Sequence, residues 1–300
     1  MTMVVEKCPL CGGQDHGPFE RHEEAGHALQ YRLCRTCGLM LQSPRMSDEE
    51  LAAFYTSSYR LTVQGTEAPT EKDLRMQAGR ARHLVRFSQG RLPAVARHLD
   101  IGCSSGALLR AFSRSYGCES VGVEPGQAYR AVAASRGTRA VASLDDLDDM
   151  QAATFDLVSL VHVLEHIADP VAYLRRLREE RLSPGGTLLV EVPNLFGHQG
   201  VELSHLTVYA PRTLCQVLQA SGFRVLKMRT HGVPRSPILR LYVTALARRL
   251  PEGAGEPRIR FSGRGVRARR RIGLWLNETM TRRLPNWTWQ EWPEPEDSGT

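Results

Sequence analysis

Four cysteines near the start of the chain have the spacing of metal ligands. They form two Cys-x-x-Cys pairs, Cys8 with Cys11 and Cys34 with Cys37, and a glycine follows each pair directly. Two such thiolate pairs can close one tetrahedral site, which is the geometry that zinc prefers. Because four thiolates leave no coordination position open, we expect a structural zinc ion.

A second group of residues has the pattern of a small-ligand site. The segment HLDIGCSSGALL, residues 98–109, places a glycine-rich turn between an apolar run and a helix-like pattern. A dinucleotide site would need G-x-G-x-x-G, so that backbone amides can approach a pyrophosphate. Here Asp100 precedes the turn; its carboxylate would repel phosphate but suits a ligand that carries ammonium and sulfonium groups. Glu124, at the end of the next strand-like run, can accept hydrogen bonds from both hydroxyls of a ribose.

These residues need a parallel sheet to bring them together. Residues 91–230 alternate strand-like and helix-like patterns, which indicates an α/β, Rossmann-like, doubly wound sheet. The expected strands lie near residues 95–102, 120–124, 138–143, 155–163, 183–194 and 223–230. Ligands of such sheets bind at the carboxyl ends of the strands, where the topology switches direction. Every candidate ligand-binding residue of this region falls at such an end.

Three flanking regions complete the expected organisation. Residues 1–45 form the zinc ribbon, and residues 46–90 form a helical lid or linker that opens with a capping box of Ser47 and Glu50. Residues 231–300 are rich in Arg, Pro and Gly and form a helical extension. Within them, the segment NWTWQEW, residues 286–292, alternates Trp with polar residues. It predicts either the antiparallel seventh strand of the sheet or an aromatic wall for a sugar.

The middle region resembles a known family. The segments LDIGCSSG, VGVEPG and FDLVSLVHVLEHIADP, with the SPGGTLLVEVPN that follows, are similar to the class I S-adenosylmethionine-dependent methyltransferases over residues 95–230. The resemblance implies a seven-stranded sheet and S-adenosylmethionine as the cofactor. It implies that Gly102, Ser104 and Gly106 line the methionine part and that Glu124 holds the ribose. It also implies that Leu144 or Asp145 lies beside the adenine. It also places His162 near the methyl group. Ser104 stands where many members have glycine.

The cysteine-rich start extends this resemblance. The segment CRTCGLMLQSPRMSDEELAAFYTSSYR resembles the zinc-ribbon subgroup of these methyltransferases, which includes enzymes that act on deoxysugars and other bacterial secondary metabolites. By the same resemblance, Tyr59 reaches the methyl site from the lid.

Methyl transfer to a hydroxyl needs a group that removes its proton, and two histidines are candidates. His205 lies in the loop after the fifth strand, in VELSHLTVYAPRTL, and histidine titrates near neutrality. This loop resembles the histidine segment of the zinc-ribbon subgroup, whose sugar C-methylating members carry an acidic residue just before the histidine. Ser204 occupies that position here, which favours O-methylation. His166, in VLEHI, is the second candidate; we interpret Glu165 as mainly structural.

Composition bears on compartment and partners. The chain has 300 residues, seven cysteines and a formal net charge of +7. It has no apolar run long enough to span a membrane and no signal-peptide pattern at Met1, so we expect a cytoplasmic protein. Basic and acidic residues balance within residues 1–45, which argues against nucleic acid as a partner. Three interpretations of the Arg-rich tail stay open: a solvated face that covers the sheet, a site for a phosphorylated or carrier-linked substrate, and an interfacial membrane helix.

Together these patterns predict an enzyme that methylates a hydroxyl of a small metabolite, most simply a sugar or a glycosylated or polyketide-like natural product. The mechanism is in-line displacement at the sulfonium methyl with a histidine as general base. One alternative is C-methylation of a keto-deoxysugar nucleotide, and another is a non-catalytic nucleic-acid-binding protein. We expect a small-molecule substrate, and neither nucleic acid nor a membrane as a partner.

Overall fold

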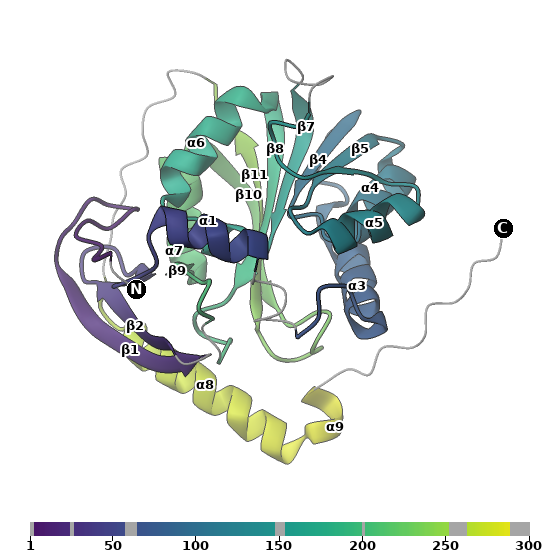
Figure 1. Cartoon of the computed structure of the whole chain (residues 1–300). Coiled ribbons are helices and arrows are strands. Elements are labelled where there is room, and N and C mark those ends of the chain that lie inside the picture. Colours follow the sequence, from purple (N-terminus) through teal and green to yellow (C-terminus); the bar gives the residue numbers. More distant parts are fainter. Residues whose placement is uncertain are drawn as a thin grey trace.

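The structure is a computed structural model that describes residues 3–24, 27–57, 65–147, 154–199, 202–251 and 263–288. It contains two sheets. The larger has seven strands in the order β10-β11-β8-β7-β4-β5-β6, and the smaller has four in the order β1-β2-β3-β9. In Figure 1 the large sheet fills the centre, strands β1 and β2 of the small sheet lie beside it in purple, and the yellow helix α8 runs beneath.

The large sheet is mostly parallel. Its strands are β4 (Arg97–Ile101), β5 (Glu119–Val123), β6 (Arg139–Val141), β7 (Phe155–Val161), β8 (Leu182–Pro193), β10 (Phe223–His231) and β11 (Tyr242–Arg249). The five strands from β6 to β8 pair in parallel, and β11 pairs antiparallel with both β8 and β10. The predicted doubly wound α/β sheet is therefore confirmed.

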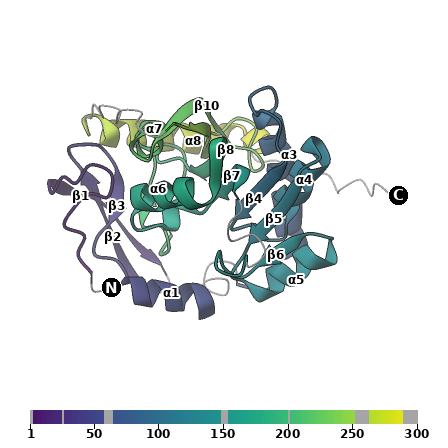
Figure 2. The same cartoon turned by 90° about the horizontal axis from the view of Figure 1, so that it is seen from above.

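Helices cover both faces of this sheet, as Figures 1 and 2 show. Their bounds are α3 (Glu71–Ser88), α4 (Ala107–Tyr116), α5 (Gln127–Ser135), α6 (Pro170–Glu180) and α7 (Pro211–Ala220). Successive strand residues point to opposite faces. On β7, Leu157 therefore packs with the core of α3 and α4, whereas Val158 packs with that of α6 and α7. Both faces are buried, which explains the long apolar strand patterns.

The order of the strands defines where a ligand can bind. From β4 the chain moves through β5 to β6 at one edge, and then returns to β7 on the other side of β4. The connections on the two sides of β4 therefore diverge at its carboxyl end. Ligands of doubly wound sheets bind at such a switch point, which here lies at the carboxyl ends of β4, β5 and β7.

The seventh strand is not where the sequence predicted it. It is β11, formed by residues 242–249, and six of its eight residues are buried. The Trp-containing segment instead begins with the short helix α9 (Pro285–Thr288), so the strand prediction is wrong for those residues; residues 289–292 lie outside the described part.

The small sheet joins the N-terminal region to the core. Its strands are β1 (His16–Glu24), β2 (His27–Cys34), β3 (Met40–Gln42) and β9 (Thr207–Val208), and β9 belongs to the loop after β8. Helix α1 (Asp48–Ser57) follows β3. The predicted capping box opens it, since the Ser47 amide donates to Glu50 at 2.8 Å and the Glu50 amide donates to the Ser47 hydroxyl at 3.2 Å.

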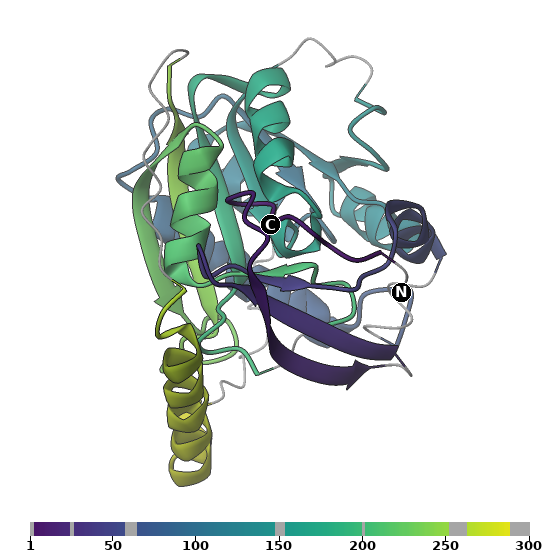
Figure 3. The same cartoon turned by 90° about the vertical axis from the view of Figure 1, so that its left-hand side faces the viewer.

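Two short elements and one long helix complete the described chain. The 3-10 turn η2 (Leu164–His166) follows β7, and α8 (Val266–Arg283) precedes α9. In Figure 3, α8 extends below the body of the molecule. None of the helices in the described ranges is both long enough and apolar enough to cross a bilayer.

Candidate active site

The glycine turn after β4 has a backbone that only small residues can form. Gly102 has a φ of +75° and Gly106, which caps α4, has a φ of +73°. A Cβ on Gly102 would lie 2.5 Å from a methyl carbon of Val163, and one on Gly106 would lie 2.4 Å from the hydroxyl of Thr138. Ser104 also has a positive φ, of 51°. Residues 102–106 thus form a tight cradle at the switch point.

Glu124 lies beside this turn, at the end of β5. Its side chain is 2% exposed, and its two carboxylate oxygens accept hydrogen bonds from the Ser104 amide at 3.1 Å and the Gly126 amide at 2.9 Å. The structure therefore brings the predicted ribose-binding carboxylate next to the predicted methionine-binding turn.

Asp100 is the second buried carboxylate at the switch point, and a chain of polar side chains supports it. The Ser159 hydroxyl donates to Asp100 Oδ1 at 2.5 Å and lies 2.8 Å from His98 Nε2, while His98 Nδ1 lies 3.3 Å from the Ser120 hydroxyl. Burial lowers the pKa of His98 to about 3, so its ring is neutral, and the direction of the chain assigns its proton to Nε2. Burial raises the pKa of Asp100 to about 7; the Glu124 charge adds to this and the Ser159 hydrogen bond opposes it.

Gln77 on α3 closes the turn from the other side. Its amide nitrogen donates to the Ser104 hydroxyl at 3.0 Å, and its carbonyl oxygen accepts hydrogen bonds from the backbone amide and the hydroxyl of Ser105. Gln77 was not predicted from the sequence. No local signal marks it, because it lies in an ordinary helical pattern, and only the packing of α3 against α4 brings it to the turn.

His162, at the end of β7, is fixed through both of its ring nitrogens. Its Nδ1 lies 3.3 Å from Glu165 Oε1 and its Nε2 lies 3.5 Å from Glu191 Oε1. Glu191 is fully buried, and Arg80 Nε lies 2.8 Å from it. Burial and the Arg80 charge lower the pKa of His162, but the hydrogen bonds to Glu165 and Glu191 outweigh them and raise it overall.

The two candidate bases lie together beside a carboxylate. Glu165, His166 and His205 each place a carboxylate oxygen or ring nitrogen within 4.8 Å of the other two. The ring centroids of His166 and His205 are 5.1 Å apart. Glu165 is 1% exposed. Burial alone would raise its pKa, but the His162 hydrogen bond and the His166 charge lower it to about 2, so it is ionised. Glu165 thus lies beside His162 as well as the two candidate bases.

His205 has a carboxylate partner that the sequence analysis missed. Glu202 Oε2 lies 3.5 Å from His205 Nε2, and the His205 amide donates to the Glu202 carbonyl at 2.9 Å, so a four-residue turn brings the two side chains together. An acidic side chain therefore lies beside His205, although position 204 is a serine. Burial and the nearby His166 lower the pKa of His205 to about 3, so its imidazole is neutral at physiological pH.

The N-terminal region holds the His205 segment in place. The Tyr31 hydroxyl of β2 lies 2.9 Å from the carbonyl oxygens of both Glu202 and His205. The backbone amide of Gln42, on β3, donates to the Leu206 carbonyl at 2.9 Å. Strand β9, which begins at Thr207, pairs with β3. The position of His205 therefore depends on strands that lie far away in the sequence.

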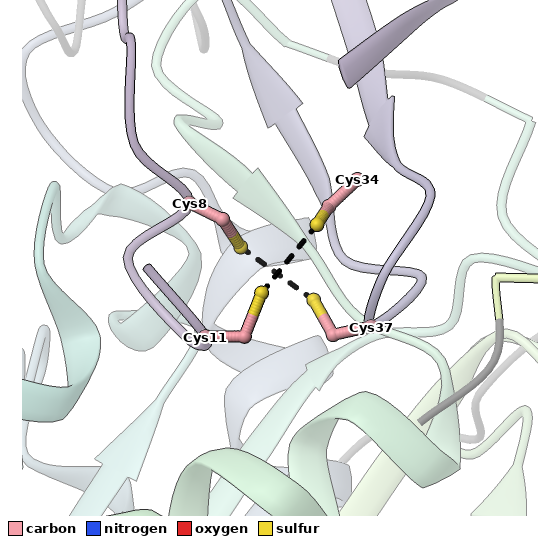
Figure 4. Close-up of side chains that lie close together, drawn as sticks. All are labelled: Cys8, Cys11, Cys34 and Cys37. Carbon is pink, nitrogen blue, oxygen red and sulfur yellow. Dashed lines mark hydrogen bonds between the residues drawn. The ribbon is translucent and has the colours of Figure 1, made fainter. Parts of the chain in front are cut away.

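The four N-terminal cysteines converge on one point, as Figure 4 shows. The Sγ atoms of Cys8 and Cys37 are 3.5 Å apart, as are those of Cys11 and Cys34, and all four lie within 4.8 Å of one another. None of them is in a disulfide. Each pair is turned back by a glycine amide that donates to the first cysteine's carbonyl at 2.8 Å. This arrangement of four sulfur donors fits a tetrahedral metal ion.

Three predicted residues remain: the two assigned to the adenine and the tyrosine of the lid. Leu144 and Asp145 follow β6 at the same end of the sheet; Leu144 is half-buried against the core and Asp145 is exposed. Tyr59 lies outside the described residues.

Comparison with known proteins defines the class of this protein. A family model described as a methyltransferase domain matches residues 73–228, just over half of the chain. The match runs from α3 to β10 and therefore includes the glycine turn, both carboxylates at the switch point and the His205 loop. The chain belongs to this methyltransferase family.

Individual relatives agree with this assignment. A ubiquinone biosynthesis O-methyltransferase of Xanthomonas axonopodis pv. citri (strain 306) is 33% identical over 109 residues, which cover 34% of this chain and 45% of that protein. The protein of the same name from Bradyrhizobium sp. (strain ORS 278) is 35% identical over 103 residues, with coverage of 33% and 40%. The chain thus spans less than half the length of these curated relatives.

A solved structure supports the fold. The 1,6-didemethyltoxoflavin-N1-methyltransferase of Burkholderia thailandensis, with bound 1,6-didemethyltoxoflavin and S-adenosylhomocysteine, matches with a TM-score of 0.54. It is 20% identical, and the match covers 77% of this chain and 100% of that one. The large sheet and its helices therefore have the Rossmann-like methyltransferase fold.

Proposed function

We propose that this protein transfers a methyl group from S-adenosylmethionine to a hydroxyl of a small metabolite, a sugar or a glycosylated or polyketide-like natural product. The observation that carries the proposal is the pairing of the glycine turn with two buried carboxylates, Asp100 and Glu124, at the switch point of the sheet. Such a site repels phosphate but suits a ligand with a ribose diol and cationic groups. The names of the curated relatives support the choice of oxygen as the acceptor.

The cofactor would supply an activated methyl group on its sulfonium sulfur. In the proposed site, Glu124 would accept hydrogen bonds from the ribose hydroxyls and Asp100 would hold the amino group. Residues 102–106 would hold the methionine part by close backbone approach. Methyl transfer forms a bond between the acceptor oxygen and the methyl carbon and breaks the bond from that carbon to sulfur, and the acceptor hydroxyl loses its proton.

His205 is the residue that we propose takes this proton. It is neutral, and with Nε2 facing Glu202, Nδ1 is the nitrogen that accepts. Its lowered pKa makes the free imidazole a weak base. The Glu165 charge opposes this lowering only in part. The acceptor hydroxyl becomes more acidic as its oxygen bonds to the methyl carbon, which allows a weak base to take the proton. His166 supports His205 by fixing the loop, since its Nδ1 lies 3.0 Å from the Ser204 carbonyl.

The four cysteines are proposed to hold a structural zinc ion. Four thiolates fill its coordination sphere, so the metal takes no part in methyl transfer. Its role is to fix the ribbon that supports the His205 loop. We propose that the protein works in the cytoplasm on a small-molecule substrate.

C-methylation of a keto-deoxysugar nucleotide is the second candidate, and Glu202 favours it. A histidine paired with a carboxylate can remove a proton from the carbon next to a ketone, which leaves a carbanion as the methyl acceptor. The absence of an acidic residue at position 204 no longer argues against this chemistry.

Two measurements test the proposal. Calorimetric titration with S-adenosylmethionine and S-adenosylhomocysteine, together with metal analysis, should give micromolar binding and one zinc ion per chain; no binding of either compound would refute it. The acceptor type is then tested by incubating the protein with a nucleoside diphosphate 4-keto-6-deoxysugar in D₂O without cofactor. Deuterium uptake at the carbon next to the ketone, lost in His205→Ala, would establish C-methylation. Methyl ethers formed from deoxysugar glycosides or phenols would establish O-methylation.

A further inference from the structure

Helix α8 carries an unusual amount of exposed apolar surface. Ile272, Trp275 and Leu276 are 57%, 61% and 45% exposed. Their spacing of three and four residues puts them on one face of the helix. Only two other large apolar side chains in the described ranges are comparably exposed: Leu284, just after this helix, and Val4. We call Ile272, Trp275 and Leu276 the apolar stripe.

The opposite face of α8 is fixed to the protein, so the stripe cannot turn inward. Arg270 is 4% exposed, and its Nη2 lies 2.8 Å from Glu20 Oε2 on β1. The Asn277 side chain donates to the Gly197 carbonyl at 2.7 Å. Gly273 allows the helix to approach the loop after β8, since a Cβ there would lie 2.1 Å from the Phe196 carbonyl oxygen. Figure 3 shows that α8 extends beyond the body of the molecule, and the exposed fractions of the apolar stripe place the stripe on its outer face.

Exposed arginines surround the stripe. At 100° per residue, Arg271 and Arg282 lie along the side of Trp275, Arg269 lies on the side of Leu276, and Arg283 follows one end. All four are exposed. Glu278, the one acidic residue of the helix, pairs with Arg282 at 2.6 Å, so among the described residues Arg271 carries the unpaired charge on the Trp275 side. An apolar strip with a cationic margin is the pattern of helices that lie in the plane of a membrane surface.

We propose that α8 is an interfacial helix that docks this protein on the anionic surface of a lipid bilayer. The apolar stripe would enter the boundary between headgroups and acyl chains, and the arginines would contact lipid phosphates. This inference selects the interfacial helix among the three interpretations of the Arg-rich tail, and it departs from the expectation that no membrane is a partner. The sequence alone could not decide this, because the loop after β8 and strand β1 determine which face of α8 is covered and which is exposed.

The charges favour a bilayer over the other occupants of such a face. A second copy of this chain would meet the stripe through a two-fold axis, and that arrangement sets arginines beside arginines. A nucleic acid would neutralise the arginines but would leave Ile272, Trp275 and Leu276 against phosphate and sugar. A bilayer surface offers both an anionic layer and an apolar layer. Docking would also bring the loop after β8, which leads to His205, close to the membrane.

The test uses the full chain and vesicles of equal parts phosphatidylglycerol and phosphatidylcholine, with phosphatidylcholine vesicles for comparison. Co-sedimentation should be strong with the anionic vesicles, weak with the neutral ones, and reduced by high salt. The triple variant Ile272→Ser, Trp275→Ser, Leu276→Ser should bind at least about tenfold more weakly. Arg271→Gln and Arg282→Gln should each cost about fivefold.

Matched controls separate this effect from general stickiness or unfolding. Val4→Ser removes an equally exposed apolar side chain, and Arg114→Gln removes an exposed charge on α4; both should bind vesicles like the wild type. Thermal melting and S-adenosylmethionine binding report on folding of every variant. The inference is overturned if anionic vesicles do not bind the protein, or if the triple variant binds them as well as the wild type. It is also overturned if the stripe instead supports a dimer in analytical ultracentrifugation or binding only to duplex DNA.

Discussion

The glycine turn and the His205 loop are both at the carboxyl edge of the large sheet, but they are built in different ways. The turn owes its shape mainly to its own short sequence, because Gly102 and Gly106 adopt positive φ angles. Its supports from elsewhere are the neighbouring strand β5, whose Val123 carbonyl accepts hydrogen bonds from the Gly102 and Cys103 amides, and Gln77. The His205 loop is held by residues far away in the chain: Tyr31, Gln42 and strand β3. The difference implies that cofactor binding and proton transfer can be damaged separately.

The largest separation of the two functions should come from His205→Ala. We expect a decrease in kcat of about 100-fold or more, because the acceptor hydroxyl loses its base. The affinity for S-adenosylmethionine should stay unchanged, because His205 does not contact the turn. Steady-state kinetics and calorimetry on the same preparation measure both quantities. His22→Ala, which removes an exposed histidine from β1, is the matched control. If His205→Ala keeps wild-type turnover, another residue removes the proton.

Loss of the metal should cause the next largest decrease in turnover, and it should again leave the affinity for the cofactor unchanged. Cys34→Ser breaks the four-thiolate cluster and loosens β2, which carries Tyr31. A small displacement of a catalytic group lowers turnover strongly, so we expect a decrease of about 10- to 100-fold. Tyr31→Phe, which keeps the cysteines but removes the hydroxyl, should cost about fivefold. If S-adenosylmethionine binding falls as far as turnover in Cys34→Ser, the ribbon supports the whole fold. The glycine turn and the His205 loop could then not be damaged separately.

The local character of the turn explains why the sequence predicted it. Gly102 and Gly106 have positive φ angles and close neighbours, so the constraint is visible as glycine in the sequence. Strand β7 was equally visible, because burial on both faces gives a continuous apolar run. The cysteine pairs also form local turns, and their spacing alone indicated that their sulfur atoms converge.

Two features that the sequence did not reveal have different origins. Glu202 reaches His205 through a local turn from position 202, not from the adjacent position 204, whereas Gln77 meets Ser104 only after α3 packs on α4. Strand β11 was hidden because it lies in an Arg-rich region. The alternating tryptophans of residues 286–292 resembled a strand more closely, although periodicity over so few residues cannot distinguish an edge strand from a helix end.

Asp100 allows a pH test of the turn. Its pKa in the free protein is about 7, because burial favours the neutral acid. A cationic cofactor binds the ionised form, so binding below pH 7 must release a proton and is weakened. The affinity for S-adenosylmethionine should therefore rise about tenfold from pH 6 to pH 8 and then level off.

Calorimetry in buffers of different ionisation enthalpy counts the released proton. Asp100→Asn should bind more weakly and should lose this pH dependence, whereas His205→Ala should keep it. A proton release that persists in Asp100→Asn would assign the titration to another group.

The smallest predicted effect concerns Gln77, and it decides whether α3 belongs to the turn or to the acceptor side. Gln77→Ala removes the side-chain hydrogen bonds that tie α3 to Ser104 and Ser105. Each such bond contributes modestly, so we expect the Kd for S-adenosylmethionine to rise about fivefold while kcat at saturating cofactor changes little. Gln89→Ala, at the exposed end of the same helix, controls for a general effect on α3. A loss of kcat with an unchanged Kd would instead show that α3 acts on the acceptor, and the turn would then be less self-contained than its sequence implies.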